Sequence, residues 1–143
     1  RFHDLGDRSG LAFAELHLGK LALLRADYPT GAMYLHRALR TAAEITDWVA
    51  TLESLEGLAM LLSETAEPAR AAHALGAAEA LRESLGVPVP AIHLPALTEC
   101  QRALAAALPP EVLAASHQAG RAAAQQALGQ PGTPAGGLLP AGS

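Results

Sequence analysis

The chain has 143 residues and a formal net charge of −4, and half of its residues are hydrophobic although only 3% are aromatic. This length favours a single domain, and a composition dominated by Ala and Leu lacks the β-branched and aromatic residues that all-β folds need. Because the ten Lys and Arg are spread along an acidic chain, we expect no direct binding to nucleic acid.

The first half of the chain predicts two helical hairpins, over 8–45 and 48–85. Apolar residues three and four positions apart predict helices near 8–26 and 29–45 in the first hairpin, and the same spacing continues in the second. In the first helix we expect five residues to face the core: Leu11, Ala14, Leu18, Leu21 and Ala22.

Residues that typically begin and end helices stand near these boundaries. Asp7 and Asp47 can each cap a helix by accepting hydrogen bonds from its first free N–H groups. Pro29 and Pro68 stand where the second helix of each hairpin begins, a position at which the missing N–H costs nothing. Gly86 is expected to end the fourth helix, before an extended Val-Pro-Val-Pro segment.

A third, less regular pair of helices is predicted over 95–128. One helix runs near 95–108, and the next begins at Pro109-Pro110 and reaches about Leu128. In the last helix we expect an inward face made of Val112, Ala115, Ala119, Ala122 and Ala123. Residues 129–143 are rich in Pro and Gly and lack apolar periodicity, which predicts a disordered linker or tail after a helical domain of residues 1–128.

The chain aligns with itself at an offset of 40 residues, at which Asp27-Tyr28 falls on Glu67-Pro68. The first unit carries Leu18-Gly19 and then Gly31, Leu35 and Ala38, a series of small and large residues that resembles the tetratricopeptide repeat. The second unit repeats the series with Leu58-Ala59, Ala71, Leu75 and Ala78. The resemblance implies an all-α fold, an α-solenoid in which about six helices form a right-handed stack of helical hairpins.

The chain also resembles the long-period repeats near the C-terminus of large bacterial transcriptional regulators, the signal-transduction ATPases with LuxR-type or related DNA-binding domains. Segments 5–12, 55–59 and 74–86 carry this similarity, and the last reads Ala-Leu-Gly-Ala-Ala-Glu-Ala-Leu-Arg-Glu-Ser-Leu-Gly. In that family the repeats are a protein-interaction or sensing arm, while ATP hydrolysis and DNA binding belong to other domains. This chain contains no Gly-rich phosphate loop.

The resemblance therefore implies a repeat arm of a cytoplasmic bacterial transcriptional regulator. Its partner would be a protein or peptide, or the adjacent domains of the parent chain. The alternative is a generic structural scaffold that mediates protein assembly. We expect no membrane span, because charged residues or His interrupt every Leu-rich segment, and we interpret a chain that starts at Arg1 without Met as a piece of a longer protein.

No residue pattern points to an enzyme, a cofactor or a metal. The six histidines lack the spaced pair and the Glu of a zinc-binding helix. Cys100, the single cysteine, cannot form an internal disulfide, and we expect it to be a small buried hydrophobe in a reducing compartment. The carboxylate pairs Glu53 with Glu56 and Glu79 with Glu83 each share one helix face, which is typical of a solvated surface.

Repeats of this kind bind partners through a concave surface lined by the first helix of each hairpin. The resemblance to the tetratricopeptide motif places eight residues in that groove: Phe13, Leu16, Lys20, Leu23, Glu53, Glu56, Met60 and Ser63. The apolar residues among them are expected to receive an amphipathic partner helix. The alternative is that a preceding repeat covers them.

Overall fold

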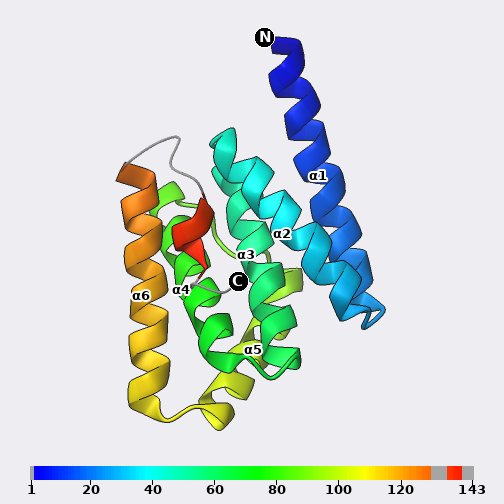
Figure 1. Cartoon of the computed structure of the whole chain (residues 1–143). Coiled ribbons are helices and arrows are strands. Elements are labelled where there is room, and N and C mark those ends of the chain that lie inside the picture. The colour runs from blue at the N-terminus through cyan, green and yellow to red at the C-terminus, as the bar shows by residue number, and fades with distance from the viewer. Residues whose placement is uncertain (1, 130–134, 140–143) are drawn as a thin grey trace.

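The computed structural model describes residues 2–129 and 135–139, and these residues form helices and turns without a strand (Figure 1). The expected all-α class with about six helices is confirmed. The α-helices are α1 (Phe2–Leu24), α2 (Tyr28–Glu44), α3 (Trp48–Glu64), α4 (Pro68–Leu85), α5 (Leu94–Ala107) and α6 (Pro110–Gly129), and two short 3₁₀ helices are η1 (Ala91–His93) and η2 (Ala135–Leu138). None of the helices in these two ranges is long and apolar enough to cross a membrane.

The turns after the first four helices share one backbone geometry. One residue in each turn lies in the left-handed region, with a φ angle of 58° at Ala26, 55° at Thr46, 60° at Ala66 and 68° at Gly86. The N–H of the following residue donates to the carbonyl oxygen five residues earlier, over distances between 2.8 and 3.1 Å. The same turn therefore recurs every 20 residues, half of the offset found in the sequence.

Most of the predicted helix boundaries are confirmed. Asp47 accepts a hydrogen bond from the N–H of Ala50 at 3.1 Å, and Pro68 begins α4. The prediction that Asp7 caps the first helix is wrong, because α1 begins at Phe2 and Asp7 lies inside it. No proline or turn-forming segment precedes Asp7, so nothing in the sequence stops the helix from extending through it.

The predicted buried face of the first helix is also wrong, except at Ala22. Leu11, Leu18 and Leu21 are 51%, 44% and 43% exposed. The buried residues of α1 are instead Ala12, Glu15, Leu16, Gly19 and Ala22. A Cβ atom on Gly19 would lie 2.7 Å from the side chain of Leu35 in α2. The close approach of α2 therefore decides which face of α1 is buried, and small residues mark that face.

The core lies between α2, α3 and α4. Its fully buried side chains include Leu35, Leu52, Leu55, Leu58 and Leu81. Each fully buried leucine contributes roughly 1.5–3 kcal/mol through the removal of apolar surface from water. In Figure 1 this core lies at the middle of a row of helices that begins with α1 at the right and ends with α6 at the left.

α6 packs along α4, and the two helices run parallel. A Cβ atom on Gly120 would lie 1.9 Å from the carbonyl oxygen of His73, and one on Gly76 would lie 2.1 Å from that of His117. The two backbones are therefore in direct contact, which a residue with a side chain would prevent at either position.

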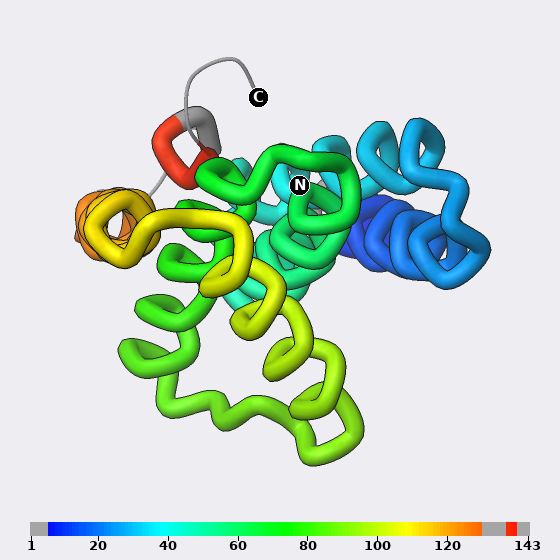
Figure 2. The backbone as a smooth tube through the Cα atoms, turned by 90° about the horizontal axis from the view of Figure 1, so that it is seen from below, coloured from blue at the N-terminus to red at the C-terminus, as the bar shows by residue number. Residues whose placement is uncertain are grey.

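This contact overturns the inward face predicted for the last helix. Four of the five residues predicted to face inward are exposed, namely Val112, Ala115, Ala119 and Ala122, and the buried residues are Gly120, Ala124 and Ala127. α5 follows a different course and packs on α3 and α4, with few contacts to α6. Figure 2 looks down the axis of α6 and shows α5 lengthwise, so the two helices do not run side by side.

Part of the segment expected to be a disordered tail packs against the helices. η2 contacts α2, α4 and α6, and Leu138 and Leu139 are 1% and 6% exposed. The ring Nδ1 of His73 lies 3.2 Å from the carbonyl oxygen of Leu138. Two consecutive leucines thus supply an apolar anchor within a Pro/Gly-rich segment. Residues 130–134 and 140–143 of the expected tail lie outside the described residues.

Candidate functional site

A narrow crevice lies between α1, α3 and α5, on the side where the groove is predicted. Its cavity of about 30 Å³ has room for about one water molecule. Nine residues line it: Lys20, Glu53, Glu56, Gly57, Met60, Arg82, His93, Ala96 and Leu97. The crevice mixes charged and apolar side chains from helices that are far apart in the sequence, and it is too small to enclose a ligand.

A buried ion pair between Glu56 of α3 and Arg82 of α4 forms one wall of the crevice. The Nε of Arg82 donates to Glu56 Oε2 at 2.5 Å, and its Nη2 donates to Oε1 at 2.8 Å. The two residues are 8% and 7% exposed. The hydrogen bonds that Arg82 donates to Glu56 raise the pKa of Arg82 above its usual value, since they stabilise the charged guanidinium.

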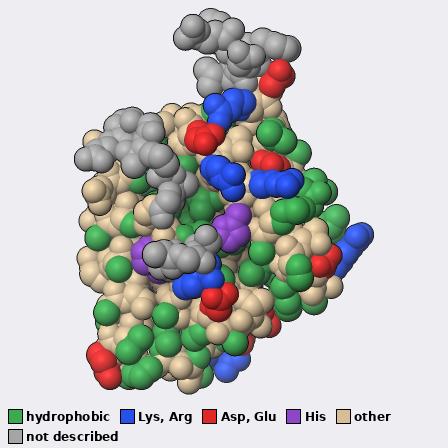
Figure 3. All heavy atoms as spheres, viewed as in Figure 1, with side chains coloured by type: hydrophobic (Ala, Val, Ile, Leu, Met, Phe, Trp, Pro, Cys, Tyr) green, Lys and Arg blue, Asp and Glu red, His purple; other side chains and the backbone are tan. Residues whose placement is uncertain are grey.

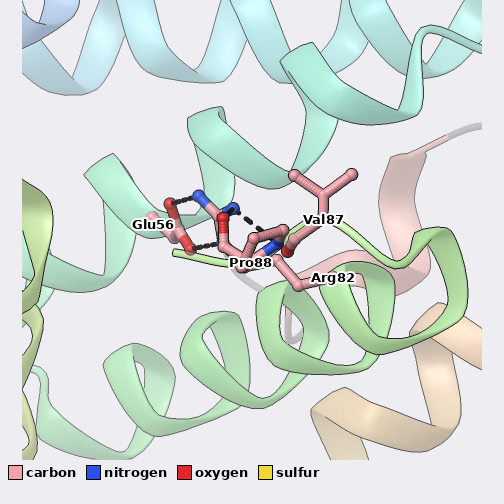
Figure 4. Close-up of polar contacts among 4 residues, drawn as sticks. All are labelled: Glu56, Arg82, Val87 and Pro88. Carbon is pink, nitrogen blue, oxygen red and sulfur yellow. Dashed lines mark hydrogen bonds and ion pairs between the residues drawn. The ribbon is translucent and has the colours of Figure 1, made fainter. Parts of the chain in front are cut away.

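The same guanidinium also holds the extended segment that follows α4. Arg82 Nη1 donates to the carbonyl oxygen of Pro88 at 2.9 Å and approaches that of Val87 at 3.4 Å. Figure 4 shows the Arg82 side chain between Glu56 and this segment. Gly86 makes the arrangement possible, because its left-handed conformation turns the chain immediately before Val87. One arginine therefore joins α3, α4 and the connection to α5.

The structure brings four of the eight predicted groove residues together. Lys20, Glu53, Glu56 and Met60 line the crevice, although Glu56 is engaged with Arg82 rather than with solvent. The other four do not line it: Phe13, Leu16, Leu23 and Ser63.

These four residues have different surroundings. Leu16 is 2% exposed and belongs to the core, and Leu23 is half-buried against it. Phe13 is 63% exposed and packs on the ring of His17, with the ring centroids 4.1 Å apart. Ser63 is half-buried and interacts with Cys100. The four residues therefore do not form one exposed apolar surface beside the crevice.

The sequence analysis missed five of the nine lining residues: Gly57, Arg82, His93, Ala96 and Leu97. Arg82 stands one residue after the buried Leu81 and four after the buried Ala78, on a face of α4 that is otherwise apolar. A lone arginine on such a face is the signal of a buried ion pair, since a buried charge needs a partner. Nothing in the sequence around His93 marks it in this way.

A second hollow of about 340 Å³ lies between α4, α5 and α6. Leu75, Leu104, Leu113 and Ala114 supply its apolar walls, and Glu79, Gln101 and His117 supply its polar groups. It exists because α6 packs on α4 while α5 packs on α3, which leaves a wedge between α5 and α6. Glu79 and His117 pair with each other here, with Glu79 Oε1 2.9 Å from His117 Nε2.

The carboxylates Glu79 and Glu83 were expected on a solvated face; Glu83 is exposed, Glu79 is half-buried, and both also connect α4 to α6. Glu79 Oε1 lies 2.9 Å from His117 Nε2, and Arg121 Nη2 donates to Glu83 Oε1 at 2.7 Å. The hydrogen bond from Arg121 holds the pKa of Glu83 below its usual value. The two contacts, one helical turn apart on both helices, fix the register of the parallel pair.

Cys100 is buried at 4% exposure, and its thiol donates to the carbonyl oxygen of Ala59 at 3.7 Å. Burial raises the pKa of this thiol, which keeps it protonated and weakly nucleophilic near neutral pH. Over residues 2–129 and 135–139, no three His, Cys, Asp or Glu side chains come together as metal ligands.

No protein-family model, curated protein or solved structure matches this chain. The resemblance to tetratricopeptide repeats and to LuxR-type regulators therefore stays a prediction.

Proposed function

We propose that this chain is a protein-interaction or sensing arm of a bacterial transcriptional regulator, built from tetratricopeptide-like hairpins in a right-handed solenoid. The observation that carries the proposal is the turn that recurs every 20 residues through four helices. Such a recurrence is typical of arrays in which each hairpin packs on its neighbours and a long surface is left for a partner. The proposed arm works in the cytoplasm, binds a protein, a peptide or adjacent domains, and carries out no catalysis.

The surface proposed for the partner combines the rim of the crevice with the exposed aromatic pair on α1. Phe13 and His17 lie before Lys20 along the same helix, and Lys20 shares the crevice with Met60. The exposed ring of Phe13 and the flexible side chain of Met60 each suit the apolar face of a partner helix, because both side chains offer large contact area. Lys20 and Glu53 supply one positive and one negative charge at the rim of the crevice.

Affinity purification of the tagged chain from its own cells, followed by mass spectrometry, tests this proposal. We expect the wild type to recover a defined partner and Phe13→Glu/Met60→Glu to lose it. Val112→Glu, at an exposed position of α6, is the matched control and should retain it. Undiminished recovery by the double variant, with its helix content intact, would overturn this surface.

The identity of the partner decides between the regulator and the scaffold. Recovery of a transcription factor, of RNA polymerase or of an ATPase with a DNA-binding domain supports the regulator. Recovery of components of one assembly, with no change in transcription when the partner is lost, contradicts the regulator and supports the scaffold.

A further inference from the structure

The hollow between α4, α5 and α6 combines a buried floor with an open mouth. Leu75 of α4 and Leu104 of α5 are buried and belong to its floor, whereas the exposed Gln101 and Ala114 lie at its mouth. Its volume of about 340 Å³ falls at the small end of the range of ligand pockets, about 300–1,000 Å³. A small molecule therefore has both room in the hollow and a way in from solvent.

The hollow has an apolar end and a polar end. On α4, Glu79 follows Leu75 by one helical turn, and on α6, His117 follows Leu113 by one turn. Because α4 and α6 run parallel, both polar residues lie toward the same end, where Glu79 Oε1 is 2.9 Å from His117 Nε2. One turn is a rise of about 5.4 Å, roughly the length of a chain of four or five carbons. The hollow thus suits an elongated molecule with an apolar body and one polar head.

The charge at the polar end decides which head fits. On the face that Figure 3 shows, several carboxylates lie beside Lys or Arg side chains, and Glu83 and Glu99 each form an ion pair with an arginine. Glu79 instead faces an imidazole, which is positively charged only when protonated. Arg121 directs both Nη1 and Nη2 to Glu83. While the imidazole is neutral, the polar end therefore carries a net negative charge.

The carboxylate of Glu79 also has an acceptor to spare. Its second oxygen, Oε2, accepts no hydrogen bond from residues 2–129 or 135–139, and the side chain of Gln101 supplies a further carbonyl oxygen to the hollow. An ammonium group carries three N–H donors and no acceptor. A ligand carboxylate would instead meet the like charge of Glu79, which is unfavourable. A primary ammonium group therefore complements the polar end.

We infer that this hollow binds a small primary amine, whose ammonium group contacts Glu79 and whose hydrocarbon chain packs on Leu75, Leu104 and Leu113. Because so few atoms take part, we expect dissociation constants in the millimolar range. The hollow shares no lining residue with the crevice, so this inference goes beyond the proposed function and does not rest on it.

NMR titration of the full chain with pentylamine tests this inference, at a mildly alkaline pH where imidazoles are neutral and the amine is charged. We expect the methyl signals of Leu75, Leu104 and Leu113 to shift. Pentylamine should bind at least about tenfold more tightly than ethylamine, because each buried methylene contributes a factor of about four. 1-Pentanol and pentanoate lack the positive charge and should bind severalfold more weakly than pentylamine.

Two variants with matched controls locate the site. Ala114→Phe fills the mouth of the hollow and should abolish the binding of both pentylamine and 1-pentanol, whereas Ala115→Phe, at the next exposed position, should leave both unchanged. Glu79→Gln should reduce the affinity for pentylamine to that for 1-pentanol. Glu64→Gln removes an exposed carboxylate from α3 and should have no such effect. Circular dichroism should show unchanged helix content in all four variants.

A wild type whose leucine signals stay fixed, or an Ala114→Phe variant that binds pentylamine like the wild type, overturns the site. Equal affinities of the wild type for pentylamine and 1-pentanol, or a preference for the amine that survives Glu79→Gln, overturns the amine as its ligand. Each of these outcomes leaves the partner surface around Phe13 and Met60 untouched.

Discussion

Gly120 of α6 lies so close to His73 of α4 that a Cβ atom at position 120 would be 1.9 Å from the His73 carbonyl oxygen. This contact sets the distance between the two helices. Glu79 also contacts His117 across the same helix pair, and Glu83 contacts Arg121.

Gly120→Ala should therefore push α6 away from α4. We expect a loss of about 1–3 kcal/mol in the free energy of unfolding, the usual cost of inserting a group into a filled contact. Urea unfolding followed by circular dichroism measures it. Gly10→Ala is the control, because nothing lies within 4 Å of a Cβ atom there, and it should stabilise α1 by up to about 1 kcal/mol. Equal effects of the two substitutions would contradict the close contact.

The ion pair between Glu56 and Arg82 predicts strong coupling in a double-mutant cycle. Arg82→Met leaves the carboxylate of Glu56 buried without its partner, and we expect it to cost about 3–5 kcal/mol of unfolding free energy. Glu56→Gln should also be destabilising. The double variant Glu56→Gln/Arg82→Met should be more stable than the sum of the single changes predicts, because it leaves no buried charge. Strict additivity of the two single effects would show that the side chains do not interact.

The left-handed turn residues predict a stabilising substitution. Ala66 has a φ angle of 60°, a conformation that costs a residue with a side chain about 1–2 kcal/mol and glycine almost nothing. After the greater flexibility of glycine in the unfolded chain is subtracted, Ala66→Gly should raise the unfolding free energy by about 0.5–1 kcal/mol. Ala69→Gly, at an exposed helical position of α4, should lower it. Thermal melts of both variants show whether each substitution raises or lowers the stability of the fold. Destabilisation by Ala66→Gly would contradict the turn geometry.

Two half-buried histidines predict that acid destabilises the fold. Burial lowers the pKa of His73 below the usual 6.5, and burial together with Arg70 and Arg40 lowers that of His36. As the pH falls through 6.5, the unfolded chain binds protons before the folded chain does. The free energy of unfolding should therefore have its full value above pH 6.5. It should decrease as the pH falls below 6.5, until the histidines of the folded chain are protonated as well.

Urea unfolding at a series of pH values measures how the free energy of unfolding depends on pH. The double variant His36→Gln/His73→Gln should reduce this dependence. Titration of the His73 ring by NMR gives the folded pKa directly. A slope of the opposite sign, or a folded pKa above 6.5 for His73, would contradict its burial beside η2.

The sequence predicted the class of the fold and most helix boundaries, because Pro, Gly and Asp act locally at the turns. It did not predict which face of α1 or α6 is buried. Leucines occur on every side of α1, so large residues cannot mark the contact face. The small residues Gly19 and Gly120 mark it, since a neighbouring helix approaches most closely where the side chain is absent.

The sequence predicted only part of the candidate site. Lys20, Glu53 and Met60 were expected in the groove, and they line the crevice. Leu16 was assigned to the groove and lies in the core, where it is 2% exposed. Arg82 was missed because its partner Glu56 is 26 residues away, and no local spacing rule connects two helices at that distance.

Methyl NMR of the two methionines tests most directly whether the face formed by α1 and α3 binds the partner. Met60 lines the crevice, whereas Met33 is 41% exposed on α2 and serves as an internal control in the same spectrum. On addition of the partner recovered by affinity purification, the Met60 methyl signal should shift or broaden and that of Met33 should stay in place. A bound partner that moves Met33 and leaves Met60 unchanged would contradict binding at this face.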